Sequence, residues 1–205
     1  IELTPYGRIV HKQYSAPDIT TAYGIASILH DMQEISPSPL YSMTVGCHGM
    51  GWLPAGSLNT SPQSLVKSIK STTRYFGGLA SQWQVNVTTL ADALDLADIH
   101  LQYLLFDACY MGGVEVAYSL RNNTDVFVAS PTEIINAGMP YNLIGNNLLQ
   151  PQGVDWEEVC NIFLEFYKSY KLPYGILSAI DCHKLDNLAI VVKEIMATNT
   201  RDYEN

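Results

Sequence analysis

Basic side chains are scarce in this sequence. Over 205 residues it contains 11 Lys and Arg against 20 Asp and Glu, which gives a net charge of −9. A protein of that charge repels the phosphates of nucleic acids and the headgroups of anionic lipids. We therefore expect no nucleic-acid partner.

Long apolar runs are also missing. The longest apolar stretches, residues 175–180 and 188–195, are far shorter than the roughly 20 residues that a membrane-spanning helix needs. With 47% hydrophobic and 15% charged residues, the composition is typical of a globular protein with one well-packed core. We expect no membrane insertion and a single domain over residues 1–205.

Cysteine is too rare for a disulfide scaffold. The four cysteines, Cys47, Cys109, Cys160 and Cys182, are irregularly spaced and form no Cys-x-x-Cys pair that would indicate zinc or a redox dithiol. The sequence also has no Asp-x-Asp-x-Asp-Gly calcium loop. We therefore expect neither a metal ion nor a cofactor.

The apolar residues that are present alternate between two periodicities. Residues 101–106 and 126–129 have the composition of buried strands, and residues 114–120 between them have helical spacing. Strand, helix, strand in this order predicts an α/β fold with a mainly parallel sheet and helices on both faces. The other predicted elements are strands 7–14, 41–46 and 174–180, a loop over 49–62, and helices 18–32 (capped by Asp18), 89–97, 155–170 and 184–196.

Reactive side chains follow two of these strands. His48 comes soon after residues 41–46, and Cys109 comes soon after residues 101–106. Open α/β sheets place their sites at the carboxyl ends of their strands. A thiol needs a neighbouring base to become a nucleophilic thiolate, so His48 and Cys109 are candidates for a base and its nucleophile. The amides of Gly49 and Cys109 are candidates for an oxyanion hole.

Structural roles for these residues stay open at this point, because free cysteine is often buried and a histidine at a strand end is often structural. Cys47 is expected to point away from His48 into the core, and Cys160 to lie on the apolar side of its helix. Cys182 and His183 are adjacent on an extended segment, where neighbouring side chains point apart. We therefore expect no second Cys–His pair there.

Two longer segments carry a resemblance. Residues 41–52 read YSMTVGCHGMGW, which resembles the His-Gly-x-Gly-Trp segment of clostripain-type peptidases. Residues 104–121 read LLFDACYMGGVEVAYSLR, which is similar to their Asp-Ala-Cys-x-Met-Gly segment. Similar continuations at 128–130 (Val-Ala-Ser) and 140–141 (Pro-Tyr) extend the resemblance over roughly residues 7–145.

The resemblance to the clostripain family implies a caspase-like three-layer fold and a cysteine endopeptidase. His48 would be the general base and Cys109 the nucleophile of a thioester mechanism without an obligatory third acid, and the amides of Gly49 and Cys109 would hold the oxyanion. The family's preference for Arg or Lys before the cut is read by acidic groups. Asp107 matches one of them, although it could instead cap the following helix. Glu133 is the candidate for a second.

The resemblance has further implications. The substrate would be a polypeptide, and the location extracellular or periplasmic in a bacterium. Some relatives cut themselves after the catalytic histidine, which here corresponds to the segment between Gly51 and Asn86, with Lys67, Lys70 and Arg74 as possible sites. An ordinary solvated helix face is the alternative for these three cations. Relatives also begin with an extra strand and helix, a unit that we expect this sequence to lack.

Two rival functions remain open. The same fold could be a catalytically silent module that binds a peptide in its cleft without cutting it. A Cys–His transpeptidase, which passes the acyl group from the thioester to an amine, would carry the same two reactive residues. Product analysis with an added amine separates hydrolysis from transfer.

Overall fold

The computed structural model describes residues 1–51, 53–56, 74–150, 152–170 and 174–199. Its elements, in chain order, are β1 (Glu2–Thr4), β2 (Gly7–Ile9), α1 (Ala22–Ile35), β3 (Tyr41–Gly46), β4 (His48–Met50), β5 (Tyr75–Gly77), the 3-10 turn η2 (Ser81–Trp83), β6 (Gln84–Asn86), α3 (Val87–Leu96), β7 (Leu101–Asp107), α4 (Val114–Leu120), β8 (Thr124–Ala129), α5 (Tyr141–Leu148), α6 (Trp156–Lys168), β9 (Ser178–Asp181), the 3-10 turn η3 (Cys182–Lys184) and α7 (Leu185–Asn199).

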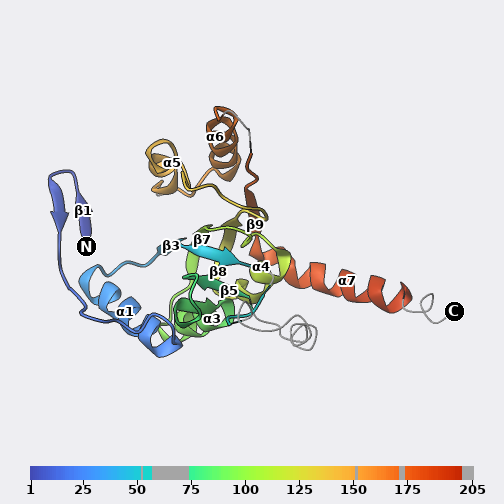
Figure 1. The fold of residues 1–205 in the computed structure, drawn as a ribbon, viewed down its shortest axis with the longest axis horizontal. Coiled ribbons are helices and arrows are strands. Elements are labelled where there is room, and N and C mark those ends of the chain that lie inside the picture. Colours follow the sequence, from blue (N-terminus) through green and yellow to red (C-terminus); the bar gives the residue numbers. More distant parts are fainter. Residues whose placement is uncertain (52, 57–73, 151, 171–173, 200–205) are drawn as a thin grey trace.

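The central sheet has the strand order β3-β7-β8-β9 (Figure 1). Strands β3, β7 and β8 are parallel, as predicted, whereas β9 runs antiparallel to β8. The difference arises because two helices, α5 and α6, connect β8 to β9, and the chain re-enters the sheet at the end where it left it. Ser178 at the start of β9 accordingly pairs with Ala129 at the end of β8.

Helices cover both faces of this sheet, so the predicted three-layer arrangement is confirmed. Strand β7 is buried on both sides: Leu104 and Phe106 enter one core, while Tyr103 and Leu105 enter the other. The first core also takes side chains from α1, α3 and α4, and the second takes them from α5 and α6. Figure 1 shows α5 and α6 on the opposite side of the sheet from α1 and α3.

A second, three-stranded antiparallel sheet, β4-β5-β6, lies beside the carboxyl end of β3. Strand β4 begins at His48, so the loop predicted from Gly49 is wrong for its first residues. The sequence could not reveal this strand, because its partner β5 lies more than 20 residues further along the chain. Residues 57–62 of the predicted loop lie outside the described residues.

Two predicted boundaries also change. Helix α1 is capped by Thr21, whose Oγ1 accepts a hydrogen bond from the Gly24 amide at 3.2 Å. Asp18 instead accepts bonds from Thr20 and Thr21 just before the helix. Strand β9 begins at Ser178 rather than at the predicted residue 174. The prediction counted Asp18 as the cap of α1 and Tyr174 as part of β9, although both residues lie just before these elements.

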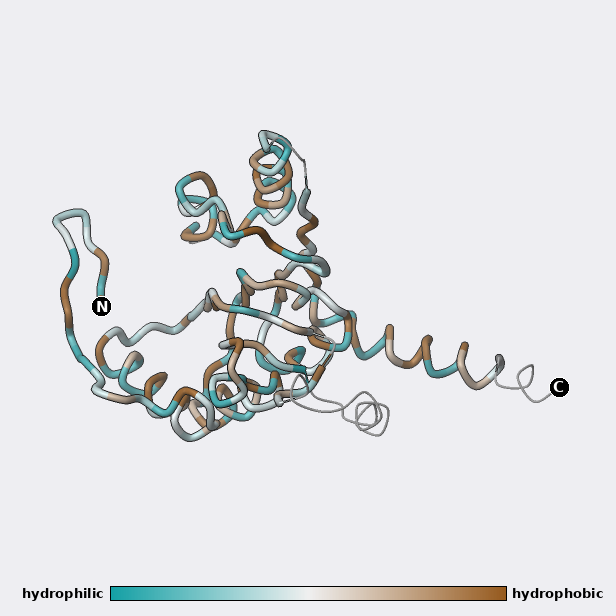
Figure 2. Tube along the Cα trace, viewed as in Figure 1, coloured by the Kyte–Doolittle hydropathy of each residue, from teal (hydrophilic) through white to brown (hydrophobic). Residues whose placement is uncertain are grey.

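Helix α7 projects from the rest of the molecule (Figure 1) and carries hydrophobic residues along its length (Figure 2). Its first residue, Leu185, is buried, but its later large apolar side chains are roughly half exposed: Leu188, Ile190, Val191, Val192, Ile195 and Met196. Among the described residues, none of the helices is both long and apolar enough to cross a membrane.

Candidate active site

The carboxyl ends of β3 and β7 lie side by side. Gly46 at the end of β3 pairs with Asp107 at the end of β7. Beyond this pair, the Cys47 amide donates to the Asp107 carbonyl oxygen at 3.3 Å. A cavity of about 250 Å³ opens at this edge, lined by residues 46–48, 107–109, 134–136 and 138. The predicted base His48, the predicted nucleophile Cys109 and the acid Asp107 therefore share one cavity.

His48 is held at this cavity by the close packing of the residue that follows it. A Cβ on Gly49 would lie only 2.4 Å from the Cys109 carbonyl oxygen and 2.8 Å from Met111 Cγ. On Gly51 it would lie 2.0 Å from the carbonyl oxygen of Tyr110. Both positions therefore require glycine. Any side chain there would push β4, and His48 with it, away from the turn that carries Cys109.

The Cys109 thiol is half-buried against the loop that follows β8. The Ile134 amide donates to Cys109 Sγ at 3.3 Å, and the thiol can donate to the Ile134 carbonyl oxygen, 3.4 Å away. The backbone of Ile134 therefore contacts the Cys109 sulfur through both its amide and its carbonyl group. Nothing in the sequence around Ile134 predicted this contact.

The turn after Cys109 has an unusual backbone. Tyr110 has a φ of 60°, a left-handed conformation that non-glycine residues seldom adopt. Its amide donates to the Thr132 carbonyl oxygen at 2.9 Å, and the Gly112 amide donates to that of Ser130 at 2.8 Å. These two bonds fix the turn to the loop after β8, so the strained conformation is held by its surroundings.

The two predicted pocket acids are not brought together. Glu133 is exposed and does not line the cavity, whereas Asp107 does. The Glu133 carboxylate instead accepts a hydrogen bond from the Tyr110 hydroxyl, and this bond is the main reason why the pKa of Tyr110 rises to about 12. Within the predicted oxyanion pair, Cys109 lines the cavity, whereas Gly49 is buried and is not among the lining residues.

Asp107 does not cap the following helix, so that interpretation is wrong. Helix α4 begins at Val114, and its N-cap, Gly113, makes no side-chain capping bond. Asp107 Oδ2 instead accepts hydrogen bonds from the Met139 amide at 3.1 Å and from the Tyr141 hydroxyl at 3.0 Å. Burial, followed by the charge of Asp107, raises the pKa of Tyr141 well above its ordinary value. The carboxylate is thus anchored at the cavity wall.

Gly138 and Tyr167 support this anchor from behind. Gly138 has a φ of +64°, and a Cβ there would lie 2.8 Å from Asp107 Oδ2. The Tyr167 hydroxyl, on α6, donates to the Gly138 carbonyl oxygen at 3.0 Å. Burial, followed by the charge of Asp107, raises the pKa of Tyr167 to about 12. Neither residue was among the predicted site residues.

The comparisons with known proteins agree with this geometry. The model of the clostripain family matches residues 11–204. The chain belongs to the clostripain family of cysteine peptidases. The predicted family is thereby confirmed. Among curated proteins, none matches the chain.

Several solved structures of this clostripain family are similar. A secreted C11 cysteine protease of Bacteroides thetaiotaomicron, "iotapain", is 42% identical with a TM-score of 0.81, over 91% of this chain and 51% of its own. A clostripain of the same species, solved with the peptide inhibitor BTN-VLTK-AOMK, is 45% identical with a TM-score of 0.57, over 59% of this chain and 53% of its own. An inactive zymogen C11 protease of Parabacteroides distasonis is 29% identical with a TM-score of 0.65, over 88% of this chain and 45% of its own. The chain therefore spans about half the length of these relatives.

Cys47 is a second thiol at the cavity of this clostripain-family chain. It packs against the first core, as expected, and also lines the cavity beside His48. Burial raises the pKa of the Cys47 thiol, which disfavours its thiolate. Cys182 is buried, while its neighbour His183 is exposed, so these two side chains point apart as predicted. They lie in the 3-10 turn η3, however, and not on the extended segment that we expected.

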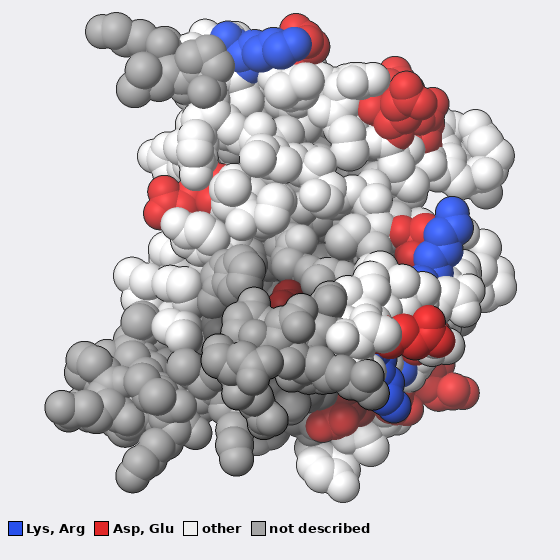
Figure 3. All heavy atoms as spheres, turned by 90° about the vertical axis from the view of Figure 1, so that its right-hand side faces the viewer, with Lys and Arg blue, Asp and Glu red and all other residues white. Residues whose placement is uncertain are grey.

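The charges elsewhere on the surface are dispersed. On the face that Figure 3 shows, acidic and basic side chains form several small groups, in some of which the two signs lie side by side, and uncharged surface separates the groups. Among the described residues, no group of three or more His, Cys, Asp or Glu is arranged to hold a metal ion. The concentrated chemistry of the described chain therefore lies at the carboxyl ends of β3 and β7.

Proposed function

We propose that the protein is a cysteine endopeptidase that cuts polypeptides after Arg or Lys through a thioester intermediate. One observation carries the proposal: a single cavity is lined by the thiol of Cys109, the imidazole of His48 and the anchored carboxylate of Asp107. A nucleophile, a base and a negative charge that can hold a cationic side chain are the groups that this reaction needs.

In the proposed reaction, His48 takes the proton of the Cys109 thiol, and the thiolate attacks the scissile carbonyl carbon. The amides of Cys109 and Gly49 stabilise the oxyanion of the tetrahedral intermediate. The C–N bond then breaks, and protonated His48 gives its proton to the leaving amine. Water, deprotonated by His48, attacks the resulting thioester, which releases the carboxylic acid and restores the thiol.

The negative charge of Asp107 supports the preference for a basic residue. Its carboxylate lies at the cavity wall within two residues of the nucleophile, where it can pair with a Lys or Arg side chain of the substrate. The clostripain of Bacteroides thetaiotaomicron was solved with an inhibitor whose peptide part, VLTK, ends in lysine. The exposed Glu133 is proposed to act at the rim of the site rather than inside the cavity.

Active-site labelling tests the proposal. A peptide chloromethyl ketone with a terminal Lys or Arg should add one label, seen by intact mass, and Cys109→Ala or His48→Ala should prevent it. Cys47→Ala is the matched control, because it removes the other thiol of the cavity and should leave the label in place. An analogue with a terminal Glu should not react. Absence of labelling by the basic reagents would instead support the silent peptide-binding module.

Hydrolysis and transpeptidation are separated by their products. If the thioester is attacked by water, an added amine leaves the product a free acid. If an amide of the added amine dominates, seen by mass spectrometry, the protein is a transpeptidase instead.

We also propose self-processing between Gly51 and Asn86. It is supported by the solved zymogen of Parabacteroides distasonis. Of the candidate sites, Arg74 is described, whereas Lys67 and Lys70 lie outside the described residues. Incubation of the wild-type protein should give a discrete cut that Cys109→Ala lacks. Identical intact bands for both proteins would exclude self-processing.

The extracellular or periplasmic location is likewise a proposal. It is supported by the secreted relative from Bacteroides thetaiotaomicron. Fractionation of the source cells should recover the protein outside the cytoplasm, and recovery in the cytoplasmic fraction would contradict this.

A further inference from the structure

The two carboxylate oxygens of Asp107 are used unequally. Oδ2 accepts hydrogen bonds from both the Met139 amide and the Tyr141 hydroxyl, at 3.1 and 3.0 Å. Oδ1 accepts none from the part of the chain that the structure describes. Each oxygen of an ionised carboxylate has two acceptor positions. Oδ2 is therefore fully occupied, and Oδ1 is the atom left for a substrate.

The surroundings hold the carboxylate in one orientation. Gly138 lies so close that a Cβ there would be 2.8 Å from Oδ2 and 3.3 Å from Oδ1. Its carbonyl oxygen is held in turn by the Tyr167 hydroxyl at 3.0 Å. Tyr141 is the first residue of α5, so its position is set by a helix. A rotation that presented Oδ2 to the cavity would break both of its hydrogen bonds.

The two basic side chains differ in what they require from such an acceptor. The lysine ammonium is a compact charge that can bond to a single oxygen. The arginine guanidinium is a planar fork whose strongest pairing uses both oxygens of one carboxylate. With one oxygen available, arginine loses its second hydrogen bond, while lysine loses nothing.

We infer that Tyr141 sets the choice between the two bases: by occupying Asp107 Oδ2, it makes the site accept lysine at least as well as arginine before the cut. This inference rests on the proposed function, in which Asp107 receives the basic side chain. Tyr141 does not touch the reacting atoms in this scheme. It is a positioning residue that acts through Asp107.

The test compares two peptide substrates that are identical except for Lys or Arg before the cut. For the wild-type protein, the ratio of kcat/KM values, Lys over Arg, should be one or higher. In Tyr141→Phe the freed position on Oδ2 can accept a second bond from arginine. The ratio should then move toward arginine by about tenfold, the worth of one charge-assisted hydrogen bond.

Tyr103→Phe is the matched control. The Tyr103 hydroxyl donates to the Leu148 carbonyl oxygen at 3.3 Å and makes no hydrogen bond to Asp107. Its loss should leave the ratio as in the wild type. An equal shift in both variants would show that the layer of α5 and α6, rather than the bond to Asp107, determines the choice, and would overturn the inference.

The remaining outcomes are equally decisive. A wild-type protein that prefers arginine by more than about tenfold would overturn the inference, even if Tyr141→Phe failed to fold. So would an active Tyr141→Phe enzyme with an unchanged ratio. In both cases cleavage after basic residues, and with it the proposed function, would stand. Cleavage after neither base would remove the proposed function and this inference together.

Discussion

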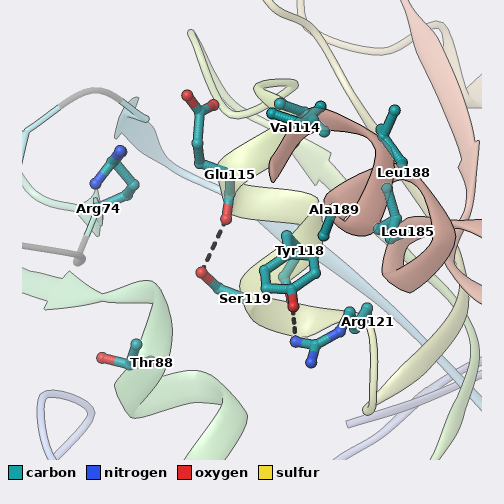
Figure 4. Close-up of a pocket in the computed structure, with 11 residues that line it drawn as sticks. Arg74, Thr88, Val114, Glu115, Tyr118, Ser119, Arg121, Leu185, Leu188 and Ala189 are labelled. Atoms are coloured by element: carbon teal, nitrogen blue, oxygen red, sulfur yellow. Dashed lines mark hydrogen bonds between the residues drawn. The ribbon is translucent and has the colours of Figure 1, made fainter. Parts of the chain in front are cut away.

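Two of the hollows that the described residues form differ strongly in character. The α4–α7 groove has a volume of about 510 Å³ and is mostly apolar, with Val114, Tyr118, Leu185, Leu188, Ala189 and Val192 among its lining residues (Figure 4). The Cys109 cavity, described above, has about half that volume, 250 Å³, and Cys109, His48 and Asp107 are among its lining residues. The larger of the two hollows is therefore not the one that contains the reactive side chains.

The difference comes from where the polar groups point. In the α4–α7 groove, both hydrogen bonds drawn in Figure 4 join neighbours in or beside α4: Ser119 to the Glu115 carbonyl, and Arg121 to the Tyr118 carbonyl. At the Cys109 cavity, residues from separate strand ends converge on one space. Convergent polar groups at the carboxyl edge of a sheet indicate a reaction site more reliably than volume does.

The largest expected effect is the difference in peptidase activity between a variant of the Cys109 cavity and a variant of the α4–α7 groove. Cys109→Ala should lower peptide hydrolysis by at least about 1,000-fold, because the other thiol of the cavity, Cys47, packs against the first core and burial raises its pKa. Val192→Asn, which makes the α4–α7 groove more polar, should change kcat/KM by less than about twofold, because Val192 is roughly half exposed and lies outside the Cys109 cavity. A groove variant as inactive as Cys109→Ala would reverse this assignment.

Two glycine-to-alanine substitutions, one beside Asp107 and one in α5, should change stability in opposite directions. Gly138→Ala should cost about 1–3 kcal/mol in the free energy of unfolding and lower kcat/KM, because its φ is +64° and the new Cβ would press on Asp107. Gly145→Ala, in α5, meets no atom within 4 Å and should raise stability by about 0.5–1 kcal/mol. Urea unfolding measures both changes. Equal effects would show that the wall behind Asp107 is not tightly packed.

A smaller effect should appear at high pH. The pKa of Tyr167 is about 12 in the folded protein against an ordinary value of 10. Between these values only the unfolded chain releases the proton, so stability falls as pH rises, by at most about 1.4 kcal/mol per pH unit for one proton. Tyr167→Phe should fall less steeply over this window. If stability falls with pH equally steeply in both proteins, the pKa of Tyr167 is the same in the folded and the unfolded chain.

The smallest effect is expected at Ile195 of α7, a residue that lines neither hollow. Ile195 is 53% exposed, so Ile195→Lys should change the free energy of unfolding by less than about 0.5 kcal/mol. It should also reduce self-association in light scattering, since exposed apolar side chains promote contacts between molecules. A loss of 2 kcal/mol or more, a size typical of buried residues, would contradict the exposed position of Ile195.

The sequence predicted those parts of the site that depend on local pattern. His48, Cys109 and Asp107 each follow a strand whose apolar run is easily recognised, and parallel strands bring their ends to one edge. Ile134 and Tyr141 were not predicted as site residues. They belong to the loop and helix after β8, and they reach Cys109 and Asp107 only through tertiary contacts.

The fold shows the same division. Helices α4 and α6 were predicted almost to the residue, because their apolar spacing and, for α6, the capping Asp155 are local signals. The antiparallel direction of β9 and the strand β4 were missed. Both depend on pairing with strands that lie far away in the chain, which periodicity does not encode.

One consequence follows from the position of His48 between two sheets. The segment up to Met50 contributes an edge strand, β3, to the central sheet and the strand β4 to the small sheet, while all their partner strands lie after residue 74. A molecule cut between these segments keeps both pairings. We therefore expect that two separately produced polypeptides, each inactive alone, could reassemble into one working enzyme.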